Sequence, residues 1–167
     1  LYYWDYENEI FQRCSDTGVD TTNKVIWANV LEEEASRLVG TPFTAGGALQ
    51  ASIDIKPGDF PNAINLKSKG VVPVAVFGSA TFDVTTIDPA TVKFGPTGTE
   101  ASINVIPNGK LQFSIQDVDL DGYMDVAFQF STQATGFIAD DTIGILTGNT
   151  YSAMPIQGSD SVRIISK

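Results

Sequence analysis

The chain has 167 residues, of which 43% are hydrophobic and 18% are charged, so it has the composition of a chain that folds around a core. This length suits one main domain with a smaller addition, and is too short for two domains of ordinary size. Twenty acidic against ten basic residues give a formal charge of -10, which argues against nucleic acid or an anionic membrane as a partner, because both need basic surfaces.

The residues that most catalytic and metal sites need are scarce. The chain has no histidine, which removes the commonest general base and metal ligand, and with it most zinc and Ser-His-Asp chemistry. The single Cys14 cannot form an internal disulfide, so no disulfide within the chain stabilises this fold. A bound metal can take that stabilising role. No apolar run is long enough to span a bilayer, and we expect no membrane span. The start at Leu1, without an initiator methionine or a signal peptide, indicates a processed product or its ordered part.

Alternating and β-branched runs recur roughly every ten residues, which is typical of an all-β chain. Candidate strands cover residues 1–5, 9–14, 24–30, 51–55, 64–67, 71–77, 91–95, 101–106, 111–116, 125–130, 142–147 and 161–165. Turn residues separate them at 56–58, 107–109, 148–149 and 158–160. Only residues 31–38 have the composition of a short helix. We predict an antiparallel β-sandwich, jelly-roll or immunoglobulin-like, with an N-terminal strand extension.

The composition changes over residues 41–50 (TPFTAGGALQ), where Gly, Thr and Ala replace aromatic and charged residues. We expect a hinge that divides the chain into an N-terminal strand segment, 1–45, and a β-sandwich domain, 46–167. The first segment carries large side chains such as Trp4 and Trp27, and so few strands cannot bury them alone. It must pack either on its own sandwich or on an open sheet edge of a neighbouring copy.

The segment from Asp117 to Asp125 (DVDLDGYMD) fits the pattern D-x-D-x-D-G-x-x-D. In this pattern alternate residues turn carboxylates toward one hard cation, and the glycine permits a sharp turn. We predict calcium, because the ligand set is large, all oxygen and carried by a flexible loop. The predicted ligands are the side chains of Asp117, Asp119 and Asp121, the backbone carbonyl of Tyr123, and Asp125 directly or through a water.

The loop begins like an EF-hand loop but does not end like one. Phe128 stands at the twelfth position, where an EF-hand requires a bidentate Glu. Strand-like residues flank the loop, so it resembles the β-flanked calcium loops of integrin-type propellers and thrombospondin type 3 repeats, in which the aspartate at position nine completes the coordination. The alternative is a polar turn whose aspartates cap backbone amides, although four carboxylates in nine residues repel strongly without a cation.

A second polar group spans residues 54–65 (DIKPGDFPNAIN). Its Asp and Asn residues either form Asx turns in a tight loop, or bind a second cation through Asp54, Asp59 or Asn62 with Asp160 as a distant partner. Four further aspartates are candidates that suit turns or the surface better: Asp83, Asp88, Asp140 and Asp141.

Several segments in fixed order carry a family resemblance. They are 54–69 (DIKPGDFPNAINLKSK), 70–78 (GVVPVAVFG), 82–92 (FDVTTIDPATV), the aspartate loop and 158–164 (GSDSVRI). The chain from about 51 to 167 resembles a recurrent calcium-binding β-sandwich module appended to many secreted and surface proteins of environmental bacteria and archaea. The resemblance implies export, a β-sandwich and calcium, but no particular activity, since the module accompanies hydrolases, adhesins and structural proteins alike.

An enzyme needs a nucleophile with its base, a carboxylate pair with shifted pKa values, or a metal with an open coordination position. The sequence shows no pattern typical of any of these, so we predict no enzymatic activity. We predict an extracellular structural protein, secreted or on the cell surface, whose N-terminal strands engage the next subunit. Such a head-to-tail contact does not close, and it builds a homo-oligomer or filament. The alternative is a carbohydrate-binding or adhesion module that presents aromatics from among Trp4, Trp27, Tyr123 and Tyr151 to sugar rings.

Overall fold

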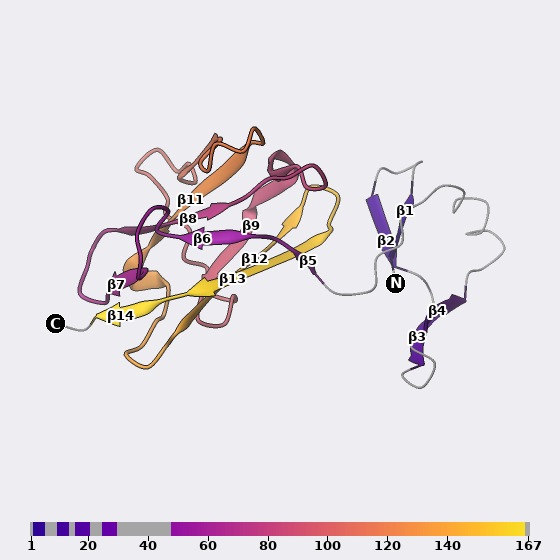
Figure 1. The fold of residues 1–167 in the computed structure, drawn as a ribbon, viewed down its shortest axis with the longest axis horizontal. Coiled ribbons are helices and arrows are strands. Elements are labelled where there is room, and N and C mark those ends of the chain that lie inside the picture. Colours follow the sequence, from indigo (N-terminus) through magenta and orange to yellow (C-terminus); the bar gives the residue numbers. More distant parts are fainter. Residues whose placement is uncertain (1, 6–9, 14–15, 21–24, 30–47, 166–167) are drawn as a thin grey trace. The chain divides into compact units, whose positions relative to one another are not determined.

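Strands form almost all of the regular structure in the computed structural model (Figure 1). The structure describes residues 2–5, 10–13, 16–20, 25–29 and 48–165. Within these ranges the helical elements are two short 3-10 helices, η1 (Val84–Thr86) and η2 (Thr132–Ala134). The predicted all-β fold is confirmed. The helix predicted at 31–38 lies outside the described residues.

The chain divides into two compact units. One comprises Leu1–Ala48 with Ser152–Met154, and the other comprises Leu49–Tyr151 with Pro155–Lys167. Most of the predicted hinge, 41–50, lies outside the described residues.

The first unit contains two antiparallel strand pairs. These are β1 (Tyr2–Asp5) with β2 (Ile10–Arg13), and β3 (Asp16–Asp20) with β4 (Val25–Asn29). The strands predicted at 1–5, 9–14 and 24–30 are confirmed as β1, β2 and β4. The polar sequence of β3 (DTGVD) gave no strand signal, and its partner β4 supplies the apolar residues of the pair.

The second unit is a sandwich of two four-stranded sheets, with strand orders β10-β11-β8-β6 and β5-β13-β12-β9. The first sheet consists of β6 (Ile53–Ile55), β8 (Val71–Val76), β10 (Phe113–Gln116) and β11 (Asp125–Ser131). The second consists of β5 (Leu49–Gln50), β9 (Ile87–Gly95), β12 (Ile143–Thr150) and β13 (Pro155–Ser161). A further pair joins β7 (Ala63–Asn65) to β14 (Arg163–Ile165). This pair and β5–β13 are parallel, and the other described pairs are antiparallel.

Alternate residues of both sheets fill the core between them. In β11, Val126, Phe128 and Phe130 are buried, while the residues between Val126 and Phe130 that alternate with them are partly exposed. Phe94 of the opposite sheet packs on Phe130 with 4.8 Å between ring centroids. Each such buried side chain contributes about 1.5–3 kcal/mol, so the apolar faces that the two-residue period turns inward stabilise the sandwich.

Two predicted turns and one predicted strand are wrong. Residues 148–149 lie inside β12 and 158–160 lie inside β13, a strand that the prediction missed. Glycine is needed there for packing: a Cβ at Gly158 would lie 2.5 Å from Cγ2 of Ile53 in the opposite sheet. Conversely, the strand predicted at 101–106 is reduced to isolated bridges at Ile103 and Val105. A glycine that lets two sheets approach looks the same in a sequence as a glycine in a turn.

Candidate metal centre

The aspartate loop connects two neighbouring strands of the first sheet. Strand β10 ends at Gln116, β11 begins at Asp125, and these two residues pair with each other. The prediction of a β-flanked loop is therefore confirmed. Within it the backbone of Gly122 has φ +94°, the left-handed conformation that the glycine of the motif is expected to supply.

Three of the four aspartates come together. Asp117, Asp119 and Asp125 each offer a carboxylate oxygen, and these oxygens lie within 4.8 Å of one another. Asp121 was predicted beside them but is not in this group, and its Oδ1 accepts a hydrogen bond from the Tyr123 N–H at 2.8 Å. The structure thus gathers three of the four carboxylates, and the fourth accepts a hydrogen bond from the loop backbone. The carbonyl of Tyr123 stays a predicted ligand.

Asp125 is the buried member of this group, with an exposed fraction of 0%. The backbone N–H of Gly78 donates to its Oδ1 at 2.9 Å, and that of Val118 donates to its Oδ2 at 2.7 Å. Burying a carboxylate is costly unless it is hydrogen-bonded and its charge is compensated. The ion pair found in the described part of the chain joins Lys56 to Asp59. No lysine or arginine in that part therefore pairs with the three carboxylates.

Backbone N–H groups also hold the two other members. The N–H of Asp121 donates to Oδ1 of Asp117 and to Oδ1 of Asp119, each at 3.2 Å, and the N–H of Gly122 donates to Oδ2 of Asp117 at 3.0 Å. These bonds fit a capped polar turn as well as a metal loop, so they fix the loop shape without deciding between the two alternatives.

The electrostatics of the loop favour a positive charge at its centre. Loss of hydration raises the pKa of the Asp119 carboxyl, and the negative charges of Asp121, Asp125 and Asp117 raise it further, against the hydrogen bond from the Asp121 backbone. A site that disfavours a third or fourth negative charge in this way favours a cation for the same reason.

Gly78 belongs to the site although the motif does not include it. It follows β8, and its N–H holds the buried carboxylate of Asp125 across 47 residues of sequence. A Cβ at this position would collide with the carbonyl oxygen of Met124. The glycine at the end of the 70–78 segment is visible in the sequence, but no local pattern connects it to the loop.

The second polar group is also brought together in part. Nδ2 of Asn62 donates to Oδ2 of Asp160 at 2.8 Å. Burial raises the pKa of the Asp54 carboxyl, and the negative charge of Asp160 raises this pKa further, while a backbone hydrogen bond lowers it. Asp59 is not part of this group, since its Oδ2 pairs with the Nζ of Lys56 at 2.6 Å.

Three of the four remaining candidates have the contacts of turn residues. Oδ1 of Asp83 accepts from the N–H of Thr85 at 2.9 Å and thereby caps η1. Oδ1 of Asp88 accepts from the N–H two residues later at 3.0 Å, and Oδ2 of Asp141 accepts from the N–H three residues earlier at 2.7 Å. The turn interpretation is confirmed for Asp83 and Asp141, whereas Asp88 lies within β9.

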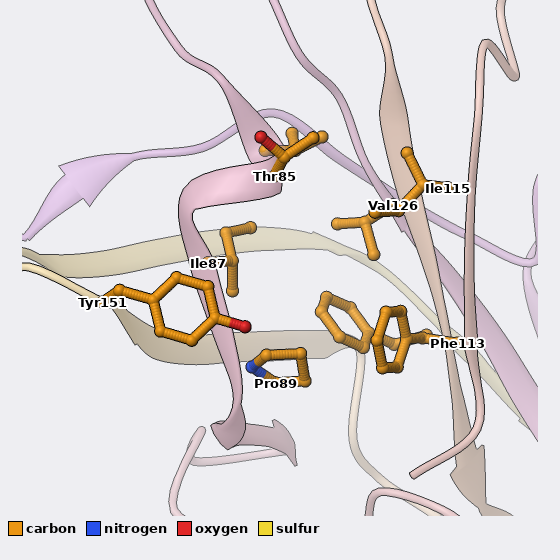
Figure 2. A pocket seen from close by; sticks show the side chains of 9 residues that line it. Thr85, Ile87, Pro89, Phe113, Ile115, Val126 and Tyr151 are labelled. Atoms are coloured by element: carbon orange, nitrogen blue, oxygen red, sulfur yellow. The ribbon is translucent and has the colours of Figure 1, made fainter.

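An apolar pocket of about 140 Å³ lies between the η1–β9 segment and strands β10 and β11. Figure 2 shows Tyr151 on one side of it, with Ile87 and Pro89 beside it, and Phe113 and Ile115 on the other side. No carboxylate or basic side chain lines it. Its surface can therefore bury an apolar group or a ring face.

The aromatic residues proposed for sugar stacking differ in exposure. Tyr151 is 69% exposed and Tyr123 is 44% exposed. Trp4 and Trp27 lie in β1 and β4, and their side chains lie outside the described part of the structure.

No protein-family model matches the sequence, and a comparison with curated proteins finds no match. The family resemblance drawn from the ordered segments therefore stays a prediction. No helix among the described residues is both long and apolar enough to cross a membrane.

Proposed function

We propose that the loop from Asp117 to Asp125 binds a calcium ion that stabilises the β-sandwich, and that the protein is not an enzyme. The observation that supports this most directly is the meeting of carboxylate oxygens from Asp117, Asp119 and Asp125 within 4.8 Å.

The charge balance explains why an ion is needed. Carboxylate oxygens that lie within 4.8 Å of one another repel when all three groups are ionised. A divalent cation with oxygen ligands removes the repulsion, and calcium accepts the irregular, partly hydrated shell that an exposed loop provides.

Chelation tests this proposal. With a chelator in place of calcium we expect the melting temperature of the wild type to fall, because an ion that binds only the folded state adds its binding energy to stability. In Asp119→Asn the melting temperature should hardly respond to chelation, whereas the matched variant Asp83→Asn, with the same change of charge on a helix cap, should respond like the wild type. A wild type whose melting curve is indifferent to calcium would refute the proposal.

We further propose that the protein is an extracellular structural subunit that assembles head to tail through its N-terminal strands. Strands β1 to β4 form two-stranded sheets, which are marginal in isolation and need a further surface for their apolar side chains. A neighbouring sandwich supplies such a surface at its sheet edges. Extracellular calcium, at millimolar concentration, also suits a partly exposed site of modest affinity.

Electron microscopy and sedimentation test the assembly. We expect filaments or a concentration-dependent series of oligomers for the full chain, and monomers after deletion of residues 1–45. Monomers in both cases, at concentrations where the full chain is folded, would contradict head-to-tail assembly.

Carbohydrate binding is a second candidate, favoured by the exposed ring of Tyr151 beside the apolar pocket. Sugar rings stack on such aromatic faces. This function requires retention of the soluble monomer on a glycan matrix and loss of that retention in Tyr151→Ala. Assembly without glycan retention would favour the structural role.

A further inference from the structure

The side chain of Asn62 carries a buried oxygen without a partner. Asn62 is 4% exposed and lies just before β7. Its Nδ2 donates to Oδ2 of Asp160 at 2.8 Å and to the carbonyl oxygen of Ser161 at 3.0 Å. Its Oδ1 has no hydrogen-bond partner among the described residues.

The orientation of this amide follows from its contacts. Both groups that face Nδ2, a carboxylate and a carbonyl, can only accept, so an exchange of the amide nitrogen and oxygen would replace two hydrogen bonds with two repulsive contacts. A buried amide oxygen without a hydrogen-bond partner is unfavourable, so a group other than the described residues is expected to meet Oδ1.

The surroundings of Asn62 carry an uncompensated negative charge. Asp160 accepts at Oδ2 from the N–H of Ile55 at 3.0 Å, which places its carboxylate next to Asp54 in β6. In the described part of the chain no basic side chain pairs with either carboxylate, since Lys56 is bound to Asp59. A water molecule would satisfy Oδ1 but leave the charges of Asp54 and Asp160 uncompensated. A cation satisfies both.

We infer that Asn62, Asp54 and Asp160 form a second cation site, separate from the aspartate loop, for a hard divalent ion such as calcium. Oδ1 of Asn62 and the carboxylate of Asp54 are its ligands, with water completing the shell. Asp160 is a positioning residue. Its oxygens already accept from the N–H of Ile55, from Asn62 and from the N–H of Ser161, so it orients the amide and adds negative charge.

The two sites stand on different strands of the sandwich. Asp54 belongs to β6, the aspartate loop precedes β11, and β8 lies between β6 and β11 in the first sheet. Binding at one site can therefore be removed without touching the ligands of the other. With two protein ligands and one further charge, the second site is the weaker of the two, on the order of the millimolar affinities of extracellular modules.

Calcium titration of the metal-depleted full chain, followed by calorimetry, tests the inference. We expect two classes of site in the wild type, and at least tenfold weaker binding at the weak class in Asp54→Asn. Asp59→Asn, with the same charge change in the same loop, should keep both classes. Asp119→Asn should lose the tight class and keep the weak one, so failure of the loop site and failure of this site give different results. A weak class that is identical in the wild type and Asp54→Asn overturns the inference.

Crystals of the wild type soaked in terbium, which takes the same oxygen ligands, give an independent measurement that needs no variant. An anomalous peak within coordination distance of Asn62 Oδ1 supports the site. A water there, without anomalous signal, overturns it.

Discussion

Gly78 donates its backbone N–H to the buried carboxylate of Asp125, and its surroundings leave no room for a side chain. A Cβ there would collide with the Met124 carbonyl oxygen and lie 3.3 Å from its carbon, and both are backbone atoms that move only with the loop. We expect Gly78→Ala to lower the free energy of unfolding by about 1–3 kcal/mol, the usual cost of overpacking, and to weaken calcium binding by displacing Asp125.

Denaturant unfolding with and without calcium measures both effects. Gly70→Ala is the matched control, because a Cβ at this glycine, just before β8, would meet only the Ser68 hydroxyl, at 3.2 Å. Equal stability of the two variants would show that the Gly78 position tolerates a side chain.

Glu100 gives a pH dependence whose sign can be worked out. Burial raises the pKa of Glu100, but hydrogen bonds from the Thr97 hydroxyl and from the Thr99 N–H to its carboxylate outweigh this, and the net pKa lies below the ordinary 4.5. A folded-state pKa below the unfolded one stabilises the protein above the unfolded value, and this stability is lost as the pH falls through the folded value.

We therefore expect the difference in unfolding free energy between the wild type and Glu100→Gln to be largest at neutral pH and to shrink as the pH falls below 4.5. Thermal denaturation of both proteins over a pH series checks this, and taking the difference cancels the acid dependence of the calcium site. A difference that stays constant with pH would show that the hydrogen bonds do not depend on the charge of Glu100.

At the scale of the element, β11 shows the period of two on which the sandwich depends. Phe128 is completely buried against Phe113 and Phe130, while Gln129 is partly exposed. We expect Phe128→Ala to cost about 3–5 kcal/mol, because it leaves a cavity, and Gln129→Ala to change stability by less than about 0.5 kcal/mol. Urea unfolding followed by far-UV circular dichroism measures the stability of both variants. Similar losses of unfolding free energy would contradict the assignment of Phe128 to the core face of β11 and Gln129 to the outer face.

At the scale of the whole molecule, both tryptophans belong to the same unit. Trp4 and Trp27 lie in β1 and β4, so tryptophan emission reports on the first unit, while most of the circular dichroism arises from the sandwich. We expect chelation of calcium to lower the midpoints of both transitions, because strands that depend on the surface of a neighbouring sandwich lose it when that sandwich unfolds. An emission midpoint that does not respond to chelation would show that the first unit is stable without the sandwich.

The continuous apolar run of β8 (VVPVAV) and the alternating large apolar residues of β11 were enough to predict these strands from the sequence, because both patterns are local. The aspartate loop was predictable for a similar reason, since its carboxylates lie within nine residues and short-range geometry brings three of them together. The position of Asp121 outside this group could not be predicted, because it depends on which backbone N–H each carboxylate reaches.

The contacts that cross the sandwich depend on the tertiary structure. The hydrogen bond between Asn62 and Asp160 joins residues 98 apart, and that between Gly78 and Asp125 joins residues 47 apart. The sequence by itself determined the class of fold and the place of the aspartate loop, because both follow from local spacing. Sheet order and sheet packing decided which distant residues support that loop and which surround Asn62, since neither leaves a repeating pattern along the chain.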